Sequence, residues 1–374
     1  MIGTTTAKNT MATDRLLGRT TAGTGIVEEI SVGTGLTLAA GSLSADGGGG
    51  ISGNTGSTDN AILRADGTGG TDLQASDLVV DDATTSTQAN VALVNNHSET
   101  NSALVLTPKG TGALIAGPKP DGTSTGGNAR GANAVDLQTL RTAASRVASG
   151  AQDVIGGGRD NTASGGNSTV CGGYFNSATA NNAVVGGGRE NQATGQSSVV
   201  CGGGGTSANQ GNLASARNSG ILSGCRAVAD REGMQAHADG RFAANGDAQR
   251  ARFVMRNKTT NDTATELFIG LAANLRLTIP SGKVFAFTIN ISGVKSDGSA
   301  VAHYLRQYCL KNVAGTTSEV YAPVTIGTDN AAGTSIALSA NDTNDALKVE
   351  VTGIASETWR WVAAVDAVEI KYGS

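Results

Sequence analysis

The chain has 374 residues, 54 of them glycine, with 3% aromatic residues, 16% charged residues and a formal net charge of −4. So little aromatic area argues against one large globular core, and so little charge argues against disorder maintained by repulsion. The sequence has no basic cluster, no run of 18 apolar residues and no apolar signal region. We therefore expect no nucleic-acid partner, no membrane insertion and no signal peptide.

Residues 1–50 form the first predicted segment. Ile26, Glu28 and Ile30 alternate with Val27, Glu29 and Ser31, which predicts a strand. Gly-Thr-Gly at 23–25 and 33–35 predicts turns. The runs DRLLGRTTAGTG and EEISVGTGL resemble the N-terminal region of phage tail fibres. This resemblance implies that residues 1–50 attach to the tail, with baseplate or other tail proteins as partners.

Residues 51–132 predict a β-rich shaft and linker. Short apolar runs are separated by Asp, Asn, Ser, Thr and Gly, and they predict strands at 61–63, 78–80, 91–94, 104–106 and 114–115. These strands are too sparse for a monomeric core, so we interpret them as threads of a three-chain β-structure. The run ALVLTPKGTGALIAG is also similar to tail-fibre shaft sequence.

Residues 133–150 predict a short helix. Asn133 is a possible N-cap and Gly150 a stop. Apolar residues follow at the 3-4-3 spacing of a coiled coil. The sequence favours a trimeric helix that registers the three chains, and the alternative is a helix packed on a neighbouring domain. The predicted seam residues are Leu137, Leu140, Ala144 and Val147.

Residues 151–240 contain a glycine-rich repeat. Aliphatic residues lead into glycines in five units. The first and third units begin 30 residues apart, at Val154 and Val184, and so do the second and fourth. A repeat this short cannot bury its own apolar face, so it must stack on its neighbours. We predict a narrow parallel β-roll. Asparagines recur at equivalent corner positions, at Asn161, Asn176 and Asn191.

This repeated pattern of Ile or Val, Gly-Gly, Asn and Ala resembles the head β-roll of trimeric autotransporter adhesins and of phage tail fibres. The competing pattern is the calcium-binding nonapeptide. Here the period is near 15, and no Asp recurs at a fixed offset, so we expect no metal. Cys171 and Cys201 share one repeat position, and we predict that they fill interior slots of the roll, with a disulfide ladder as the alternative.

Residues 241–374 predict a C-terminal β-sandwich of jelly-roll type, with eight or nine strands separated by turn residues. The runs RFVMRNKTTN, LTIPSGKVFAF and WVAAVDAVE resemble C-terminal domains of phage tail fibres. Trp359 and Trp361 share a strand face and are expected in the core. Tyr304, Arg306 and Tyr308 share another face, which would suit sugar stacking if it points outward. The alternative is that these three residues line a trimer interface or the sandwich interior.

No motif for catalysis is recognisable. The sequence lacks a P-loop, HExxH and GxSxG, and the adjacent carboxylates at 28–29 and 81–82 would point to opposite faces of a strand. We therefore expect no enzymatic activity and no cofactor. A triad assembled from distant residues is not excluded by sequence.

Taken together, these features predict an all-β homotrimeric phage tail fibre with N-terminal threads, a short coiled coil, a β-roll and a C-terminal sandwich that binds the host surface. The expected receptor is a cell-surface glycan or outer-membrane component. The expected location is the virion tail, which is assembled in the host cytoplasm and functions outside the cell. The alternatives are a structural tail or baseplate protein without receptor contact, a bacterial trimeric adhesin and a glycan depolymerase.

Overall fold

The computed structural model describes residues 15–18, 28–32, 36–39, 42–45, 61–66, 72–82, 91–95, 106, 108–205, 207–208, 210–270 and 274–373. Contacts divide the chain into two compact units, Met1–Val105 and Leu106–Ser374. Within the described residues all regular structure is β apart from one 3-10 helix, η1 (Asp342–Asn344), which confirms the all-β prediction. None of the described helices has the length and apolar character needed to cross a membrane.

The first unit contains short antiparallel pairings. The pairs are β1 (Arg15–Gly18) with β2 (Glu28–Ser31), β3 (Leu36–Ala39) with β4 (Ser42–Ala45), and β6 (Asp72–Asp82) with both β5 (Ala61–Asp66) and β7 (Val91–Asn95). Strands therefore form where the apolar runs predict them. They find partners within their own chain, which differs from the expected threads that pair between chains. The strand predicted at 104–106 lies mostly outside the described residues.

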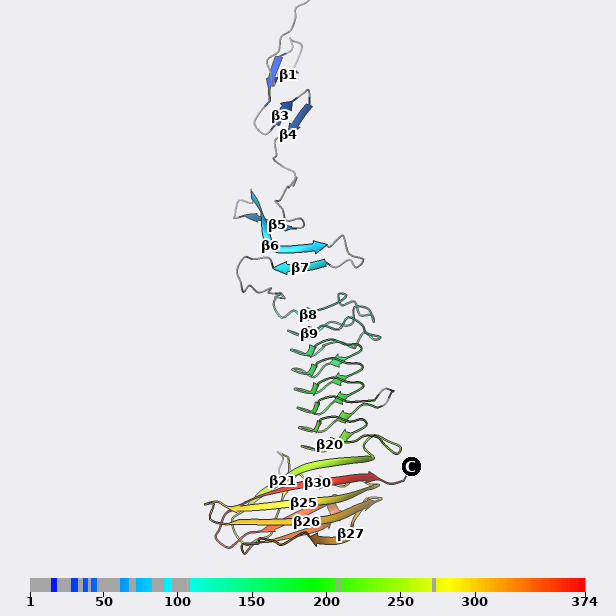
Figure 1. The fold of residues 1–374 in the computed structure, drawn as a ribbon, viewed down its shortest axis with the longest axis vertical. Coiled ribbons are helices and arrows are strands. Elements are labelled where there is room, and N and C mark those ends of the chain that lie inside the picture. The colour runs from blue at the N-terminus through cyan, green and yellow to red at the C-terminus, as the bar shows by residue number, and fades with distance from the viewer. Residues whose placement is uncertain are drawn as a thin grey trace, which may run out of the picture. The chain divides into compact units, whose positions relative to one another are not determined.

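The second unit begins with a parallel β-solenoid (Figure 1). Its first sheet contains β8 (Leu114–Ile115), β9 (Val135–Asp136), β10 (Val154–Ile155), β12 (Thr169–Val170), β14 (Val184–Val185), β16 (Val199–Val200), β18 (Gly220–Ile221) and β20 (Gln235–His237). Its second sheet contains β11 (Thr162–Ala163), β13 (Ser177–Ala178), β15 (Gln192–Ala193), β17 (Leu213–Ala214) and β19 (Val228–Ala229).

The solenoid interior is made of two facing columns of small side chains. In these two-residue strands the second residue points inward, so Ile155 and Val170 stack in one sheet and Ala163 and Ala178 stack in the other, all fully buried. Alanine lets the two sheets approach closely. At the corner, a Cβ on Gly173 (φ +86°) would lie 2.3 Å from the Gly188 carbonyl oxygen, so only glycine fits there.

The helix predicted for residues 133–150 is not formed, because this segment is a turn of the solenoid. Strand β9 pairs in parallel with both β8 and β10. Leu137 and Leu140 are exposed, Ala144 is half-buried and Val147 is buried, so they do not share one apolar seam. Two heptads carry too little helical stability to compete with pairing on a preformed sheet edge. The solenoid accordingly starts at residue 114 and not at 151.

A Greek-key β-sandwich follows the solenoid. One sheet has the order β27 (Thr316–Thr325), β26 (Val301–Val313), β25 (Lys283–Lys295), β30 (Trp359–Lys371), β21 (Ala248–Thr259), with β23 (Phe268–Ile269) beside β21. The other sheet contains β22 (Thr265–Glu266), β24 (Leu277–Thr278), β28 (Ser335–Asn341) and β29 (Ala346–Thr352). Strand β30 returns beside β25 after the β25–β26–β27 meander, as in a Greek key. The finer jelly-roll topology stays a prediction.

The sandwich core is aromatic. The rings of Trp359 and Trp361 are stacked with centroids 5.7 Å apart, and both side chains are buried, as predicted. The Trp361 Nε1–H donates to Thr259 Oγ1 at 3.1 Å. A Cβ on Gly293 would lie 2.4 Å from the Trp361 ring, so this glycine makes room for the indole.

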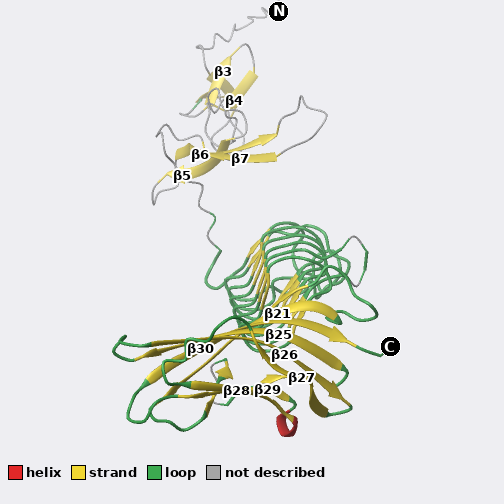
Figure 2. Ribbon diagram, turned by 60° about the horizontal axis from the view of Figure 1, so that its bottom comes forward, coloured by secondary structure: helices red, strands yellow, loops and turns green. Residues whose placement is uncertain are grey.

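The solenoid and the sandwich share one continuous sheet (Figure 2). Strand β20, the last of the first solenoid sheet, pairs antiparallel with β21 of the sandwich. Beside this junction the fully buried carboxylate of Glu369 accepts hydrogen bonds from Arg231 at 3.1 Å, from Gln249 at 2.9 Å and from Lys283. Burial opposes ionisation of Glu369, but the Arg231 and Lys283 charges outweigh burial and hold its pKa below the usual value. The two parts of this unit are therefore locked together.

Candidate functional site

The predicted receptor-binding face on β26 points into the sandwich and not toward solvent. Tyr304 and Tyr308 are 2% and 0% exposed and lie in the sandwich core. The Tyr304 hydroxyl lies 2.8 Å from Thr334 Oγ1, and burial raises the pKa of both phenols. Period-2 alternation leaves open which face is inward, and the larger rings contribute more to the core. The outward residues of β26 include His303 and Gln307.

Arg306 is half-buried and does not present a free guanidinium. Its Nη1 and Nη2 donate to the two carboxylate oxygens of Asp329, each at 2.7 Å. This bidentate pair holds the pKa of Asp329 below its usual value. The three residues predicted to bind a receptor are thus two core rings and one paired arginine.

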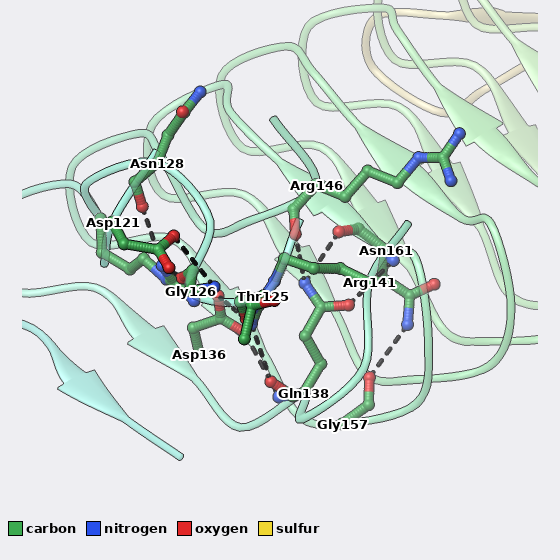
Figure 3. Close-up of polar contacts among 11 residues, drawn as sticks. Asp121, Thr125, Gly126, Asn128, Asp136, Gln138, Arg141, Arg146, Gly157 and Asn161 are labelled. Atoms are coloured by element: carbon green, nitrogen blue, oxygen red, sulfur yellow. Dashed lines mark hydrogen bonds and ion pairs between the residues drawn. The ribbon is translucent and has the colours of Figure 1, made fainter. Parts of the chain in front are cut away.

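The predicted asparagine corners form a buried ladder. Asn161, Asn176 and Asn191 occupy equivalent positions, and each side-chain oxygen accepts from the backbone N–H of the next rung at 3.0 Å. Gln138 starts the ladder by accepting from the Asn161 N–H at 2.9 Å (Figure 3). Each Nδ2 donates to glycine carbonyls, as Asn161 does to Gly157 at 2.9 Å. Since both ends of these amides are satisfied inside the coil, they hold the turns together and do not face a ligand.

The solvent side of the first solenoid sheet is an uncharged face. Cys171 and Cys201 lie on it and are exposed, so the predicted interior slots are wrong for both cysteines. Each follows a buried valine, and the residue after an inward position points outward. We define the uncharged face by its two outward columns, which are Val154, Thr169, Val184, Val199 and Gly220, and Gly156, Cys171, Gly186, Cys201 and Leu222.

The uncharged face ends at a hollow of about 320 Å³ where β20 meets β21. Leu222, which is 78% exposed, lies on one side of it and Arg250 and Arg252 on the other. Both arginines donate through Nε to Asp366, at 2.7 and 3.2 Å, and these bonds hold the pKa of Asp366 below its usual value. Beyond them the same sheet exposes further apolar residues, including Val254. The solenoid part of this surface is therefore uncharged, and its border on β21 carries arginines, of which Arg250 and Arg252 share Asp366.

A second hollow lies on the second solenoid sheet and has a volume of about 390 Å³. We call it the corner hollow. It has an apolar floor and a polar rim, formed by Phe175, Glu190, Gln192, Gly211, Asn212, Leu213, Val228 and Asn245. Nearby, the Arg146 guanidinium covers one face of the Phe175 ring at 3.7 Å from its centroid, and Arg159 and Arg189 flank the Tyr174 ring at 5.4 and 5.3 Å. Sequence reasoning missed this site, because its residues come from four different turns and from the segment that follows β20.

Across the described part of the chain, no group of three or more His, Cys, Asp or Glu side chains is placed to hold a metal ion. The isolated acidic residues of the solenoid have other partners. Asp153 accepts from Ser168 and from backbone N–H groups, and Asp160 pairs with Arg146 at 2.8 Å. These carboxylates stabilise turns.

No protein-family model matches the sequence, and no curated protein matches it significantly. Three solved structures of phage tailspikes are similar in part. They come from Acinetobacter phage vB_ApiP_P1 (10% identity, TM-score 0.21), Acinetobacter baumannii bacteriophage Fri1 (11%, 0.23) and Acinetobacter baumannii phage AM24 (8%, 0.20). The matches cover 65%, 68% and 66% of this chain, and 55%, 44% and 54% of the tailspikes, so the chain spans about half their length.

The Fri1 tailspike is described as a capsular polysaccharide depolymerase. This finding overturns the expectation that the chain is not an enzyme, which rested only on missing motifs. Glycan-cleaving sites need two carboxylates that can come from separate turns, so they leave no local motif in a sequence.

Proposed function

We propose that this chain is a homotrimeric phage tail protein that attaches the virion to the host cell surface. The N-terminal segment 1–50 would join the tail, and the C-terminal half would contact the cell. The tail-fibre-like runs at both ends of the sequence support this polarity. The observation that carries the proposal is the shared sheet at the junction of solenoid and sandwich, with its buried Glu369 network. A tip that binds cells has to be held firmly on its stalk, and this junction supplies such a connection.

The homotrimer is proposed from the uncharged face. It exposes Leu222 and, in part, the valines of its first column along the solenoid, and Val254, which is 60% exposed, lies beyond its end on β21. An exposed apolar surface of this extent is typical of an interface. Closed, symmetric association of identical chains would cover it in every copy. Three copies on one stalk would also make host attachment multivalent.

The proposal is tested with the full-length chain and the virion that carries it. Fluorescently labelled protein should bind cells that the virion adsorbs to, and excess protein should block virion adsorption. Strains resistant to adsorption serve as the control. A chain that assembles onto tails but binds no cells would instead establish the structural tail protein. Reducing-end release from purified surface polysaccharide, measured in parallel, distinguishes binding from cleavage.

A further inference from the structure

The corner hollow exists because one turn of the solenoid departs from the repeat. Strands β14 and β16 begin 15 residues apart, at Val184 and Val199, whereas β18 begins 21 residues after β16, at Gly220. The six extra residues lie between Gly203 and Asn212. They place Gly211 in the corner column that Phe175 and Glu190 occupy in the turns before.

Gly211 leaves a gap in that column. A Cβ there would lie 1.8 Å from the Glu190 carbonyl oxygen, so no larger residue fits without moving the backbone. The neighbouring corner residues Phe175 and Glu190 adopt left-handed conformations, each with φ 59°, and both line the hollow. The backbone geometry of this turn therefore maintains the gap.

The floor of the corner hollow is apolar. Leu213 and Val228 pair in register on β17 and β19, and their half-buried side chains point out from the second sheet. The Phe175 ring adds an aromatic wall, and the Arg146 guanidinium lies over one face of that ring. Such a surface suits the C–H face of a pyranose ring.

The rim supplies hydrogen-bonding groups in several directions. The exposed Gln192 amide makes no hydrogen bond to the described residues. Asn245 Nδ2 lies at a long 3.4 Å from the Gly211 carbonyl oxygen. The Glu190 carboxylate is paired with Arg189 at 3.4 Å, so its charge is balanced. The lining contains a carboxylate and amides but no lysine or arginine. This set favours sugar hydroxyls and acetamido groups over a sugar carboxylate.

We propose that the corner hollow binds a neutral hexose or N-acetylhexosamine unit of a surface glycan. This inference rests on the proposed host attachment for the source of the glycan, and it adds a contact on the stalk to that expected at the tip. The volume of about 390 Å³ falls in the range of small-ligand sites. The hollow lies on the second sheet, so assembly through the uncharged face of the first sheet would leave it open.

The test uses saturation-transfer NMR on the full-length protein with the methyl glycosides of glucose, N-acetylglucosamine and glucuronic acid. We expect transfer to one or both neutral sugars. Gln192→Ala removes an exposed amide that makes no hydrogen bond to the described residues, and it should weaken binding about fivefold, the effect of one lost hydrogen bond. Leu213→Trp should fill the hollow and abolish transfer. Ser177→Ala, at the equivalent outward position two turns before Leu213, is the matched control and should bind as the wild type does.

The proposal is overturned if neither neutral sugar shows transfer, if glucuronic acid binds best, or if the Gln192 and Leu213 variants bind like the control. Circular dichroism of Leu213→Trp shows whether loss of binding reflects the filled hollow, and Gln192→Ala decides the matter if that variant misfolds. Sugar binding without any binding to cells would leave the corner hollow established and host attachment wrong, so the two proposals fail separately.

Discussion

The solenoid and the sandwich solve the problem of a stable core in opposite ways. The solenoid repeats a thin interior of alanine, valine and isoleucine, and the asparagine ladder ties each turn to the next. The sandwich buries two tryptophans and pairs strands more than 100 residues apart, β21 with β30. Repeats that contact only their neighbours lose stability locally, whereas a core of long-range contacts is lost as a whole. We therefore expect the solenoid to unfold turn by turn and the sandwich to unfold in one cooperative step.

The largest expected effect is loss of assembly. Leu222→Glu would place three carboxylates in the proposed interface, where burial of unpaired charge is strongly unfavourable. Light scattering should give about three times the 37.2 kDa chain mass for the wild type and a lower mass for the variant. The sandwich, with its complete core, should stay folded in the dissociated chain. Ser177→Glu on the second sheet should not change the mass, and a monomeric wild type would contradict the trimer.

Trp361→Ala tests the sandwich core. The indole stacks on Trp359 and donates to Thr259, so its removal leaves a large cavity and an unpaired hydroxyl. We expect the free energy of unfolding of the sandwich to fall by about 3–5 kcal/mol. Denaturant unfolding followed by the remaining tryptophan measures it. Solenoid circular dichroism that persists after the sandwich has unfolded would support separate failure of the two parts, and simultaneous loss would contradict it.

Glu369→Gln tests the junction and its pH dependence. The variant leaves Arg231 and Lys283 without their buried counter-charge and should cost about 3 kcal/mol at neutral pH. Because the folded pKa of Glu369 is lowered, its stabilisation is complete above the usual value of 4.5 and is lost as pH falls through the folded pKa. Wild-type stability should therefore decline below about pH 4.5, and this part of the decline should be missing in the variant. An unchanged acid profile would show that the network does not control it.

Asn176→Ala tests the ladder. The substitution removes the acceptor for the Asn191 N–H and the donor to the Gly172 and Gly188 carbonyls, all inside the coil. Unsatisfied buried polar groups should cost about 2 kcal/mol. Hydrogen exchange should show faster opening of the adjacent turns and little change in β25 or β30. Asn181→Ala, an exposed position in the next corner, is the control, and a uniform change over both regions would contradict local failure.

Much of the solenoid was predictable from sequence, because its period is set by residue types that fit only one position of each turn. Alanine two positions after asparagine recurs where the second sheet needs a small inward residue, as at Ala163 and Ala178. The predicted helix was wrong because the spacing of Leu137 and Leu140 says nothing about the sheet edge on which Val135 pairs. At this segment, pairing with the neighbouring solenoid strands outweighed the local helical propensity.

The orientation of single strands was harder to predict. On β26 either face could be inward, and only the folded sandwich shows that Tyr304 and Tyr308 belong to its buried core. The corner hollow had no sequence signal beyond the six-residue excess before Asn212. Its lining comes from Phe175 to Asn245, and a site assembled across turns becomes visible only when the coil is formed.

The smallest expected effect on stability belongs to the cysteines, yet they report on the uncharged face most directly. Cys171→Ser should change the free energy of unfolding by less than about 0.5 kcal/mol, because the thiol is exposed in the single chain.

The reactivity of these thiols should depend on assembly instead. In the dissociated Leu222→Glu chain, Cys171 and Cys201 should react quickly with a thiol reagent. In the wild-type trimer both should be protected, since they lie on the face that we expect to be covered. Cys309 is buried within the sandwich, and burial raises its pKa, so it should react slowly in both states and serve as the internal reference. Mass spectrometry of labelled peptides resolves the three positions. If Cys171 and Cys201 react equally fast before and after dissociation, the chains associate through another surface, and the uncharged face must then be covered by a different partner.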